Sequence, residues 1–130
     1  MAQYIDGFVF PIARDRLTEY VVVAETVAEI YKEYGAIDYV EFVGDDMNRK
    51  CTRTFPDVLT AGENETIVFG WVVYESRASR DLVNEKVEAD PRMVDLVTPL
   101  VDPTDPVFDS NRMAYGGFLP LVGANNSDRV

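Results

Sequence analysis

The segment Phe69–Tyr74 (FGWVVY) carries no charge on either of its two alternating sets of side chains. Its β-branched and aromatic residues predict a strand, in which Phe69 and Trp71 face one way while Gly70 and Val72 face the other. A strand at the surface of a small protein normally keeps one polar face. The segment therefore predicts a sheet that is covered on both faces, although the sequence does not say what covers the second one.

The rest of the chain supplies three further strands and two main helices. The four predicted strands share the same β-branched and aromatic character: Tyr4–Ile12, Ala36–Val43, Thr66–Glu75 and Met113–Val122. Apolar residues at helical spacing follow Asp15, a candidate N-cap, and end before Gly35, which suits the position just after a helix. Ser76 is a good N-cap for a second helix that runs to about Ala89.

Two shorter helices are predicted as well. Asp90-Pro91 has the sequence of a helix cap followed by a proline in the first turn, so a short helix should continue to Val97. In the polar segment between the second and third strands, Phe55, Val58 and Leu59 predict one turn of helix that packs one side against the core.

The predicted elements follow the order β-α-β-β-α-β. This order indicates a ferredoxin-like α+β fold, with a four-stranded antiparallel sheet and two helices on one face. Because these helices cover one face only, we expect the other face to pack against a second copy, so that the homodimer forms a dimeric α/β barrel. Alternatively, residues 45–65 cover that face within one chain. Residues 1–122 should form a single domain, and residues 123–130 a flexible polar tail.

The formal net charge of −11 limits the partners of this protein. An acidic protein repels nucleic-acid phosphates and anionic membrane surfaces, so we expect neither as a partner. No apolar stretch approaches the ~20 residues of a membrane span. The first residues, MAQYIDGFVF, lack a charged leader followed by a signal-type apolar run, and we therefore expect a cytoplasmic location.

The sequence contains no histidine and a single cysteine, Cys51. A Ser-His-Asp or Cys-His catalytic arrangement, a histidine-ligated haem and a structural zinc site therefore cannot be built from this chain. Neither a Walker A motif nor G-x-G-x-x-G occurs, and we expect no cofactor and no metal. Cys51 lies among basic residues in NRKCTR, which favours a thiolate, but a solvated loop cysteine is the simpler interpretation.

Two carboxylates inside predicted strands are the candidate catalytic residues. Asp6 lies among apolar residues of the first strand, and Glu41 lies among those of the second. A carboxylate in such a place is either ion-paired, in the case of Asp6 with Arg112 or Arg77, or unpaired with a raised pKa that suits a general base.

Three further residues are candidates for a ligand pocket: Trp71, Tyr115 and Arg112. The two aromatic side chains suit a flat ligand, although core and interface positions are the more common use of such residues. Arg112 would hold an anion. Because the whole chain is negatively charged, an anionic ligand would need a locally basic pocket formed by this residue, Arg77 or Arg80.

Four sequence stretches, in this order and spacing, carry a family resemblance: YIDGF, EFVGDD, SRASRDLVNEKVEADPRM and FDSNRMAYGGF. Between Tyr4 and Val122 the chain resembles the YbaA-like family of uncharacterised bacterial proteins. That family looks like part of the dimeric α/β-barrel superfamily, so the resemblance implies the fold and the homodimer argued above. It implies no reaction and no catalytic residues, because the family has no assigned activity.

Three functions remain open. The first is a protein that binds or senses a small molecule between sheet and helices. The second is a cofactor-free enzyme, monooxygenase- or isomerase-like, for a small aromatic or acidic compound, with Asp6 or Glu41 as base and Tyr115 or Trp71 orienting the substrate. The third is an interaction protein whose apolar surface serves the dimer alone. A cavity of ~300 Å³ or more with convergent polar groups would favour the first two.

Overall fold

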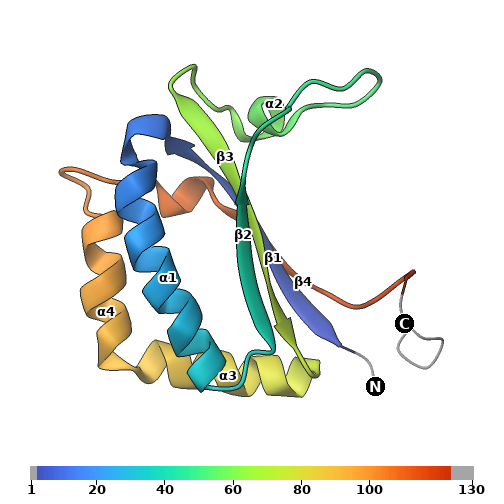
Figure 1. Cartoon of the computed structure of the whole chain (residues 1–130), viewed down its shortest axis with the longest axis vertical. Coiled ribbons are helices and arrows are strands. Elements are labelled where there is room, and N and C mark those ends of the chain that lie inside the picture. The colour runs from blue at the N-terminus through green and yellow to red at the C-terminus, as the bar shows by residue number, and fades with distance from the viewer. Residues whose placement is uncertain (1–2, 124–130) are drawn as a thin grey trace.

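The computed structural model describes residues 3–123, so that most of the predicted tail, residues 124–130, lies outside it. Within the described residues, four strands form one antiparallel sheet in the order β2-β3-β1-β4 (Figure 1). The strands are β1 (Tyr4–Ala13), β2 (Asp38–Val43), β3 (Glu65–Tyr74) and β4 (Ala114–Phe118). β4 is shorter than predicted and ends at Phe118, which lies opposite Ile5 near the beginning of β1.

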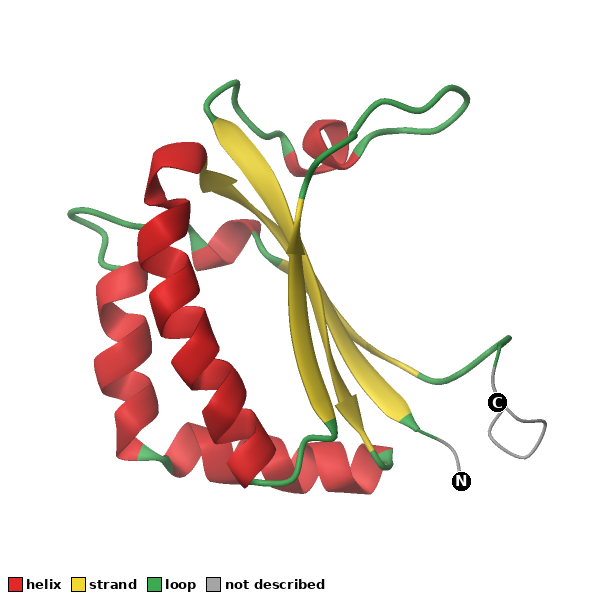
Figure 2. Ribbon diagram, in the orientation of Figure 1, coloured by secondary structure: helices red, strands yellow, loops and turns green. Residues whose placement is uncertain are grey.

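Three helices lie on one side of the sheet (Figures 1 and 2). They are α1 (Leu17–Glu33), α3 (Arg77–Ala89) and α4 (Pro91–Val97), while the single turn α2 (Phe55–Leu59) lies on the other side at one end of the sheet. Three short 3-10 turns complete the described elements: Arg14–Arg16, Thr98–Leu100 and Ser110–Arg112. The sheet and the order of its elements confirm the predicted ferredoxin-like α+β fold.

Local sequence signals set most of the helix ends. At the start of α3, Ser76 Oγ accepts a hydrogen bond from the backbone N–H of Ser79 (3.0 Å), and just after α1 Gly35 adopts a φ of +118°. The predicted cap at Asp15 is wrong. A 3-10 turn over Arg14–Arg16 leads into α1 instead, and the beginning of α1 has no side-chain cap among the described residues.

The helical connection after β3 is broken in two, and the break shapes the interior. Pro91 cannot continue α3, and Asp90 Oδ1 accepts a hydrogen bond from the backbone N–H of Arg92 (2.8 Å) at the start of α4. As a result, α3 runs across one end of the sheet, and α4 turns to lie beside α1 (Figure 1). The middle of the sheet therefore faces α1 and α4, not α3.

Two apolar clusters attach the helices to the sheet, one towards each end of β1. The first contains Ile30 of α1, Tyr74 of β3 and Val83 of α3. The second contains Phe10 of β1 and Tyr20 of α1, whose rings meet edge to face with centroids 5.4 Å apart. Phe8 packs against both clusters and marks the boundary between them. The space between the two clusters is the place where a cavity can form.

The opposite face of the sheet, which we call the open face, is apolar. Its main side chains follow from the strand register: Ile5, Val9, Val40, Phe42, Phe69, Trp71, Val73 and Phe118. Phe42 is 58% exposed and Phe69 is 40% exposed. α2 reaches one end of this face only, where Phe55 packs edge-on against Phe69 with ring centroids 5.7 Å apart. Residues 45–65 therefore leave most of the open face uncovered in a single chain.

Close packing at Gly70, on the helix side of β3, gives a first prediction. A Cβ atom there would lie 2.6 Å from Phe8 Cζ and 2.7 Å from the backbone oxygen of Val40. Because β2 is hydrogen-bonded to β3 at this point, the backbone cannot simply move aside. Gly70→Ala should therefore lower the free energy of unfolding, measured by urea denaturation, by about 2 kcal/mol.

Gly62→Ala, in an exposed turn, is the matched control and should change that free energy by less than ~0.5 kcal/mol. Equal stabilities for the two variants would contradict the packing argument.

Candidate functional site

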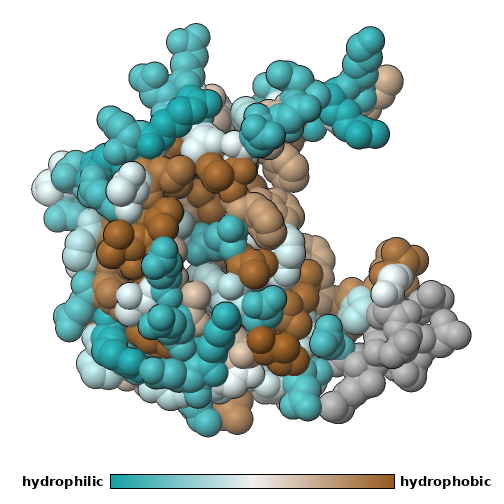
Figure 3. Space-filling model, in the orientation of Figure 1, coloured by the Kyte–Doolittle hydropathy of each residue, from teal (hydrophilic) through white to brown (hydrophobic). Residues whose placement is uncertain are grey.

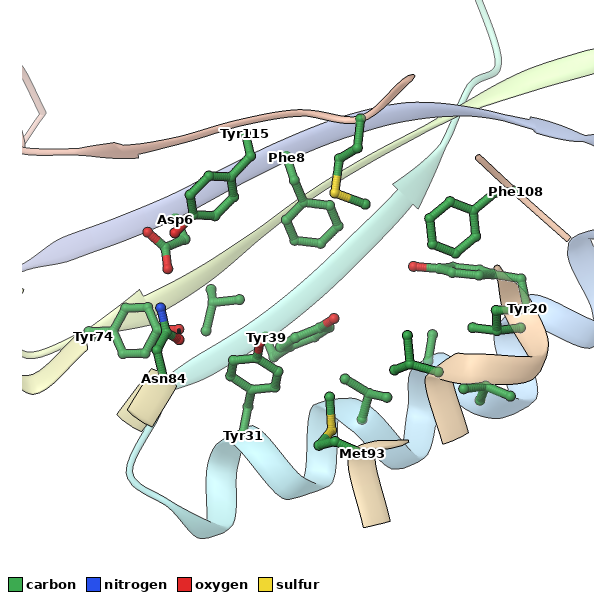
Figure 4. A pocket seen from close by; sticks show the side chains of 17 residues that line it. Asp6, Phe8, Tyr20, Tyr31, Tyr39, Tyr74, Asn84, Met93, Phe108 and Tyr115 are labelled. Carbon is green, nitrogen blue, oxygen red and sulfur yellow. Dashed lines mark hydrogen bonds between the residues drawn. The ribbon is translucent and has the colours of Figure 1, made fainter. Parts of the chain in front are cut away.

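A cavity of about 230 Å³ lies between the sheet and the helices α1 and α4. Apolar side chains form most of its wall, among them Phe8, Ala24, Val27, Val72, Met93 and Phe108 (Figure 4). Apolar surface also gathers around the hollow between helices and sheet in Figure 3. The volume is below the ~300 Å³ at which pockets for drug-sized ligands begin. An apolar cavity of about 150 Å³ nevertheless takes up benzene, so this one has room for a single ring.

Tyrosines are most of the side chains with polar groups that line the cavity. The five tyrosines that line it come from four elements: Tyr20, Tyr31, Tyr39, Tyr74 and Tyr115. Burial raises the pKa of every one of these phenols. At neutral pH the cavity therefore presents uncharged O–H groups, which can both donate and accept hydrogen bonds.

Asp6 is the carboxylate in the cavity wall, and it is only 3% exposed. Its Oδ1 lies 3.6 Å from Arg80 Nε, which is close enough for an ion pair but too far for a hydrogen bond. Neither of these two atoms has a hydrogen-bond partner among the described residues. Arg80 is held instead by its own contact with Tyr4, since Nη2 donates to the phenol oxygen (2.9 Å) and the guanidinium lies over the ring.

Tyr115, on the edge strand β4, lies beside Asp6 in the cavity wall (Figure 4). Burial raises the pKa of Tyr115 to about 12, and the neighbouring Asp6 carboxylate adds to the effect through hydrogen bonding and through its negative charge. The pair therefore consists of a carboxylate acceptor next to a neutral phenol. A ligand in the cavity meets both an acceptor and a donor at this end.

Glu41, on β2, lies next to the cavity but does not line it. It borders a separate hollow of about 220 Å³ on the outer side of α1 and β2, and Tyr20 and Tyr39 line both spaces. The Tyr20 hydroxyl donates a hydrogen bond to Glu41 Oε1, while Oε2 is buried without a partner in the described part of the chain. Burial raises the pKa of Glu41, and hydrogen bonds from the two tyrosines partly offset that rise. Glu41 and the two tyrosines thus separate the cavity from the outer hollow.

The structure brings together only some of the residues that the sequence suggested. Asp6 and Tyr115 line the cavity, and Glu41 is its neighbour. Trp71 lies on the open face, stacked on Phe42 with ring centroids 5.4 Å apart, outside the cavity.

Arg112 is also placed away from the cavity. Its guanidinium forms two hydrogen bonds with Glu65, of 2.8 and 2.9 Å, and lowers the pKa of that carboxyl. It is not the partner of Asp6, and neither is Arg77, because Arg80 occupies that place.

Several residues of the cavity wall belong to the apolar stripe of α1. Tyr20, Ala24, Val27 and Tyr31 follow one another at helical spacing on α1, and such a stripe is normally the core-facing side of a helix. The only hint of a cavity in this stripe is its polar content, since two of the four side chains carry hydroxyl groups. Over residues 3–123 no cluster of acidic or cysteine side chains could hold a metal ion, and no helix is both long and apolar enough to cross a bilayer.

The raised pKa of Glu41 predicts a pH-dependent stability. Because the folded state binds this proton more tightly than the unfolded state, the contribution of Glu41 to stability is greatest below its unfolded pKa of ~4.3 and declines as pH rises through its folded pKa. Glu41→Gln removes the titration. The difference in urea midpoint, variant minus wild type, should therefore increase as the pH is raised from about 4 to 8.

Glu25→Gln, an exposed position on the same hollow, is the control and should show a constant difference. A constant difference for Glu41→Gln as well would refute the assigned pKa direction.

Comparison with known proteins places the chain in a family. A family model described as "Protein of unknown function (DUF1428)" matches residues 3–109. Over 120 residues the chain is 35% identical to the uncharacterized protein YbaA of Escherichia coli strain K12, covering 92% of this chain and 97% of YbaA. This relationship confirms the resemblance seen in the sequence.

Solved structures share the fold. A NIPSNAP-like domain protein from Burkholderia xenovorans superposes with a TM-score of 0.59 at 15% identity, over 95% of this chain and 89% of that one. A nipsnap family protein of unknown function from Agrobacterium tumefaciens gives 0.58 at 12% identity, over 95% and 92%. Sequence identities this low show that the proteins share a fold, and nothing about a shared function. The family match and the relationship to YbaA together show that the chain belongs to the DUF1428 family of proteins of unknown function.

Proposed function

We propose that this protein is a homodimer that binds a small, uncharged, one-ring compound in the cavity between sheet and helices. The observation that carries the proposal is Asp6 Oδ1, which is buried in an aromatic wall without a hydrogen-bond partner among the described residues. Buried polar atoms are almost always hydrogen-bonded. A ligand hydroxyl group would supply the missing donor, while its ring would fill the apolar part of the cavity.

Charge considerations favour an uncharged ligand. Asp6 and Arg80 already compensate each other, so a charged ligand would bring an uncompensated charge next to mostly apolar side chains. An anion would in addition be repelled by the net charge of −11. A phenol satisfies both conditions, because it is neutral at pH 7 and carries one strong donor next to an apolar ring.

The ligand class is tested with three matched compounds: 4-methylphenol, toluene and 4-methylbenzoate. Isothermal titration calorimetry should give the order 4-methylphenol tighter than toluene, and toluene tighter than 4-methylbenzoate. Asp6→Asn should weaken the binding of 4-methylphenol about 10-fold, because a hydrogen bond to a charged acceptor is replaced by one to a neutral acceptor. The same variant should leave toluene binding nearly unchanged.

Asp81→Asn is the matched control, because Asp81 is the other carboxylate near Arg80 (3.4 Å) but its side chain is 59% exposed and does not line the cavity. It should not change any of the three affinities. Tightest binding of the benzoate would overturn the proposed ligand class, and no binding of any of the compounds would remove the support for a one-ring ligand.

The homodimer is proposed from the open face. Phe42, Phe69 and Phe118 are each at least 40% exposed there, and no charged side chain separates them in the sheet. An exposed apolar surface of this kind is typical of an interface. A second copy of the chain has the same apolar face. Two open faces related by two-fold symmetry would therefore cover each other.

A charge on the open face should prevent the dimer. Phe42→Glu would bury an unpaired carboxylate, so the dimer dissociation constant measured by sedimentation velocity should rise at least about 100-fold. Val22→Glu, at a 65% exposed position on α1 away from the open face, should leave it unchanged. A wild-type protein that sediments as a monomer at micromolar concentration would refute the homodimer.

A further inference from the structure

One end of the cavity is closed by a face of α3 that carries two polar side chains. Arg80 and Asn84 lie one helical turn apart on α3 and therefore project from the same side of the helix. Arg80 is the ion-pair partner of Asp6 (3.6 Å), while Asn84 lines the cavity together with Asp6 (Figure 4). Asn84 is thus a second polar side chain at the end of the cavity where the proposed ligand meets Asp6.

The side-chain amide of Asn84 has a defined orientation because Tyr74 holds its oxygen. Tyr74 is fully buried (0% exposed), and its hydroxyl group donates a hydrogen bond to Asn84 Oδ1 at 3.1 Å. A buried hydroxyl group nearly always has an acceptor, and Asn84 Oδ1 is the acceptor of this one among the described residues. The amide therefore keeps its oxygen towards Tyr74 and turns its nitrogen, Nδ2, away from it.

Nδ2 of Asn84 is directed towards the carboxylate of Asp6 (Figure 4). Within residues 3–123 it donates no hydrogen bond, and Asp6 Oδ1 likewise accepts none. An unused donor and an unused acceptor thus lie at the same end of a mostly apolar cavity without a hydrogen bond between them. A single ligand atom that accepts from one and donates to the other would satisfy both.

We infer that Asn84 is a specificity-determining residue of the cavity: its Nδ2–H donates to the oxygen of the ligand hydroxyl group whose proton is donated to Asp6 Oδ1. The inference rests on the proposed function and adds which polar group the ligand carries. A hydroxyl group donates and accepts at the same time, whereas the N–H groups of an aromatic amine chiefly donate, because the nitrogen lone pair is delocalised into the ring. The cavity therefore selects a phenol over an aromatic amine of the same shape.

Two uncharged compounds of nearly the same shape test this selection: 4-methylphenol and 4-methylaniline, with toluene as the ring that has no polar group. Isothermal titration calorimetry at neutral pH gives their affinities for the wild-type protein and for Asn84→Leu, whose side chain is of similar size but has no donor. The variant should weaken the binding of 4-methylphenol about 10-fold. It should leave the affinities of 4-methylaniline and toluene nearly unchanged.

A second comparison separates ligand contact from folding, since Asn84→Leu also leaves the buried Tyr74 hydroxyl group without an acceptor. Tyr74→Phe and the double variant Tyr74→Phe/Asn84→Leu both lack that hydroxyl group, so they differ in the Asn84 amide alone. The double variant should bind 4-methylphenol more weakly than Tyr74→Phe does, with equal affinities for toluene. Asn48→Leu, the same change at an exposed loop position that does not line the cavity, is the control and should alter none of the affinities.

The side-chain amide of Asn84 also gives a direct readout in a ¹⁵N–¹H correlation spectrum, where its pair of signals is the one missing from Asn84→Leu. A hydrogen bond to the ligand oxygen should place one of these protons further downfield when 4-methylphenol is bound than when toluene is bound. A residue that only supports the fold would give the same position with both ligands.

An affinity ratio of 4-methylphenol to 4-methylaniline that is the same in the wild type and in Asn84→Leu would overturn the inference. The proposed ligand class would then stand, as long as the binding of 4-methylphenol still depends on Asp6. A wild-type protein that does not bind 4-methylphenol at all would instead refute the proposed function, and the inference with it.

Discussion

The break between α3 and α4 is the constraint on which the interior of this protein depends. As one helix, residues 77–97 would be about 30 Å long and would lie along the sheet. Pro91 prevents this, and Asp90 holds the resulting corner by accepting hydrogen bonds from the Arg92 side chain and from the Tyr34 hydroxyl at the end of α1 (2.7 Å). These bonds keep the pKa of Asp90 well below its usual range, so the corner is ionised at neutral pH. The corner sends α4 to the side of α1 and leaves space over the middle of the sheet.

That space has two properties that make the folded chain less stable when no ligand is bound. A cavity forfeits van der Waals contacts between the groups that surround it, and a buried acceptor without a donor loses the hydration it had in the unfolded chain. Asp6 Oδ1 and the apolar wall around it combine both costs in one place. A bound ring with a hydroxyl group would offset them together, and the third hypothesis, a dimer without a ligand, gives no reason for either. This is the physical basis for preferring a binding function.

The fold could be predicted because its determinants are local. Alternation in the strands, the caps at Ser76 and Asp90, and the glycine at position 35 each act within a few residues. The site could be predicted only in part, because alternation shows which residues share a face but not which face the helices cover. The chemistry of Trp71 and Asp6 suggests one shared pocket, yet the register sets Asp6 opposite Val72, and therefore on the other side of the sheet from Trp71. The pairing of Asp6 with Arg80 depends on how α3 crosses the end of the sheet, which no local signal specifies.

The proposed ligand cavity and the proposed dimer interface lie on opposite faces of the same strands. Side chains alternate along β1: Asp6 and Phe8 face the cavity. Gly7 and Val9 face the proposed interface. A sheet is one backbone thick, so the side chains of the two sites do not touch, and a substitution in one reaches the other only by moving the strands. Within one chain, β1 and β3 are held against helices on one side alone. In the homodimer a second sheet would hold them on the other side, which would fix the spacing of Asp6 and Tyr115 at the cavity wall. The dimer would thus contribute to ligand binding by restraining the wall, without placing any residue in the cavity.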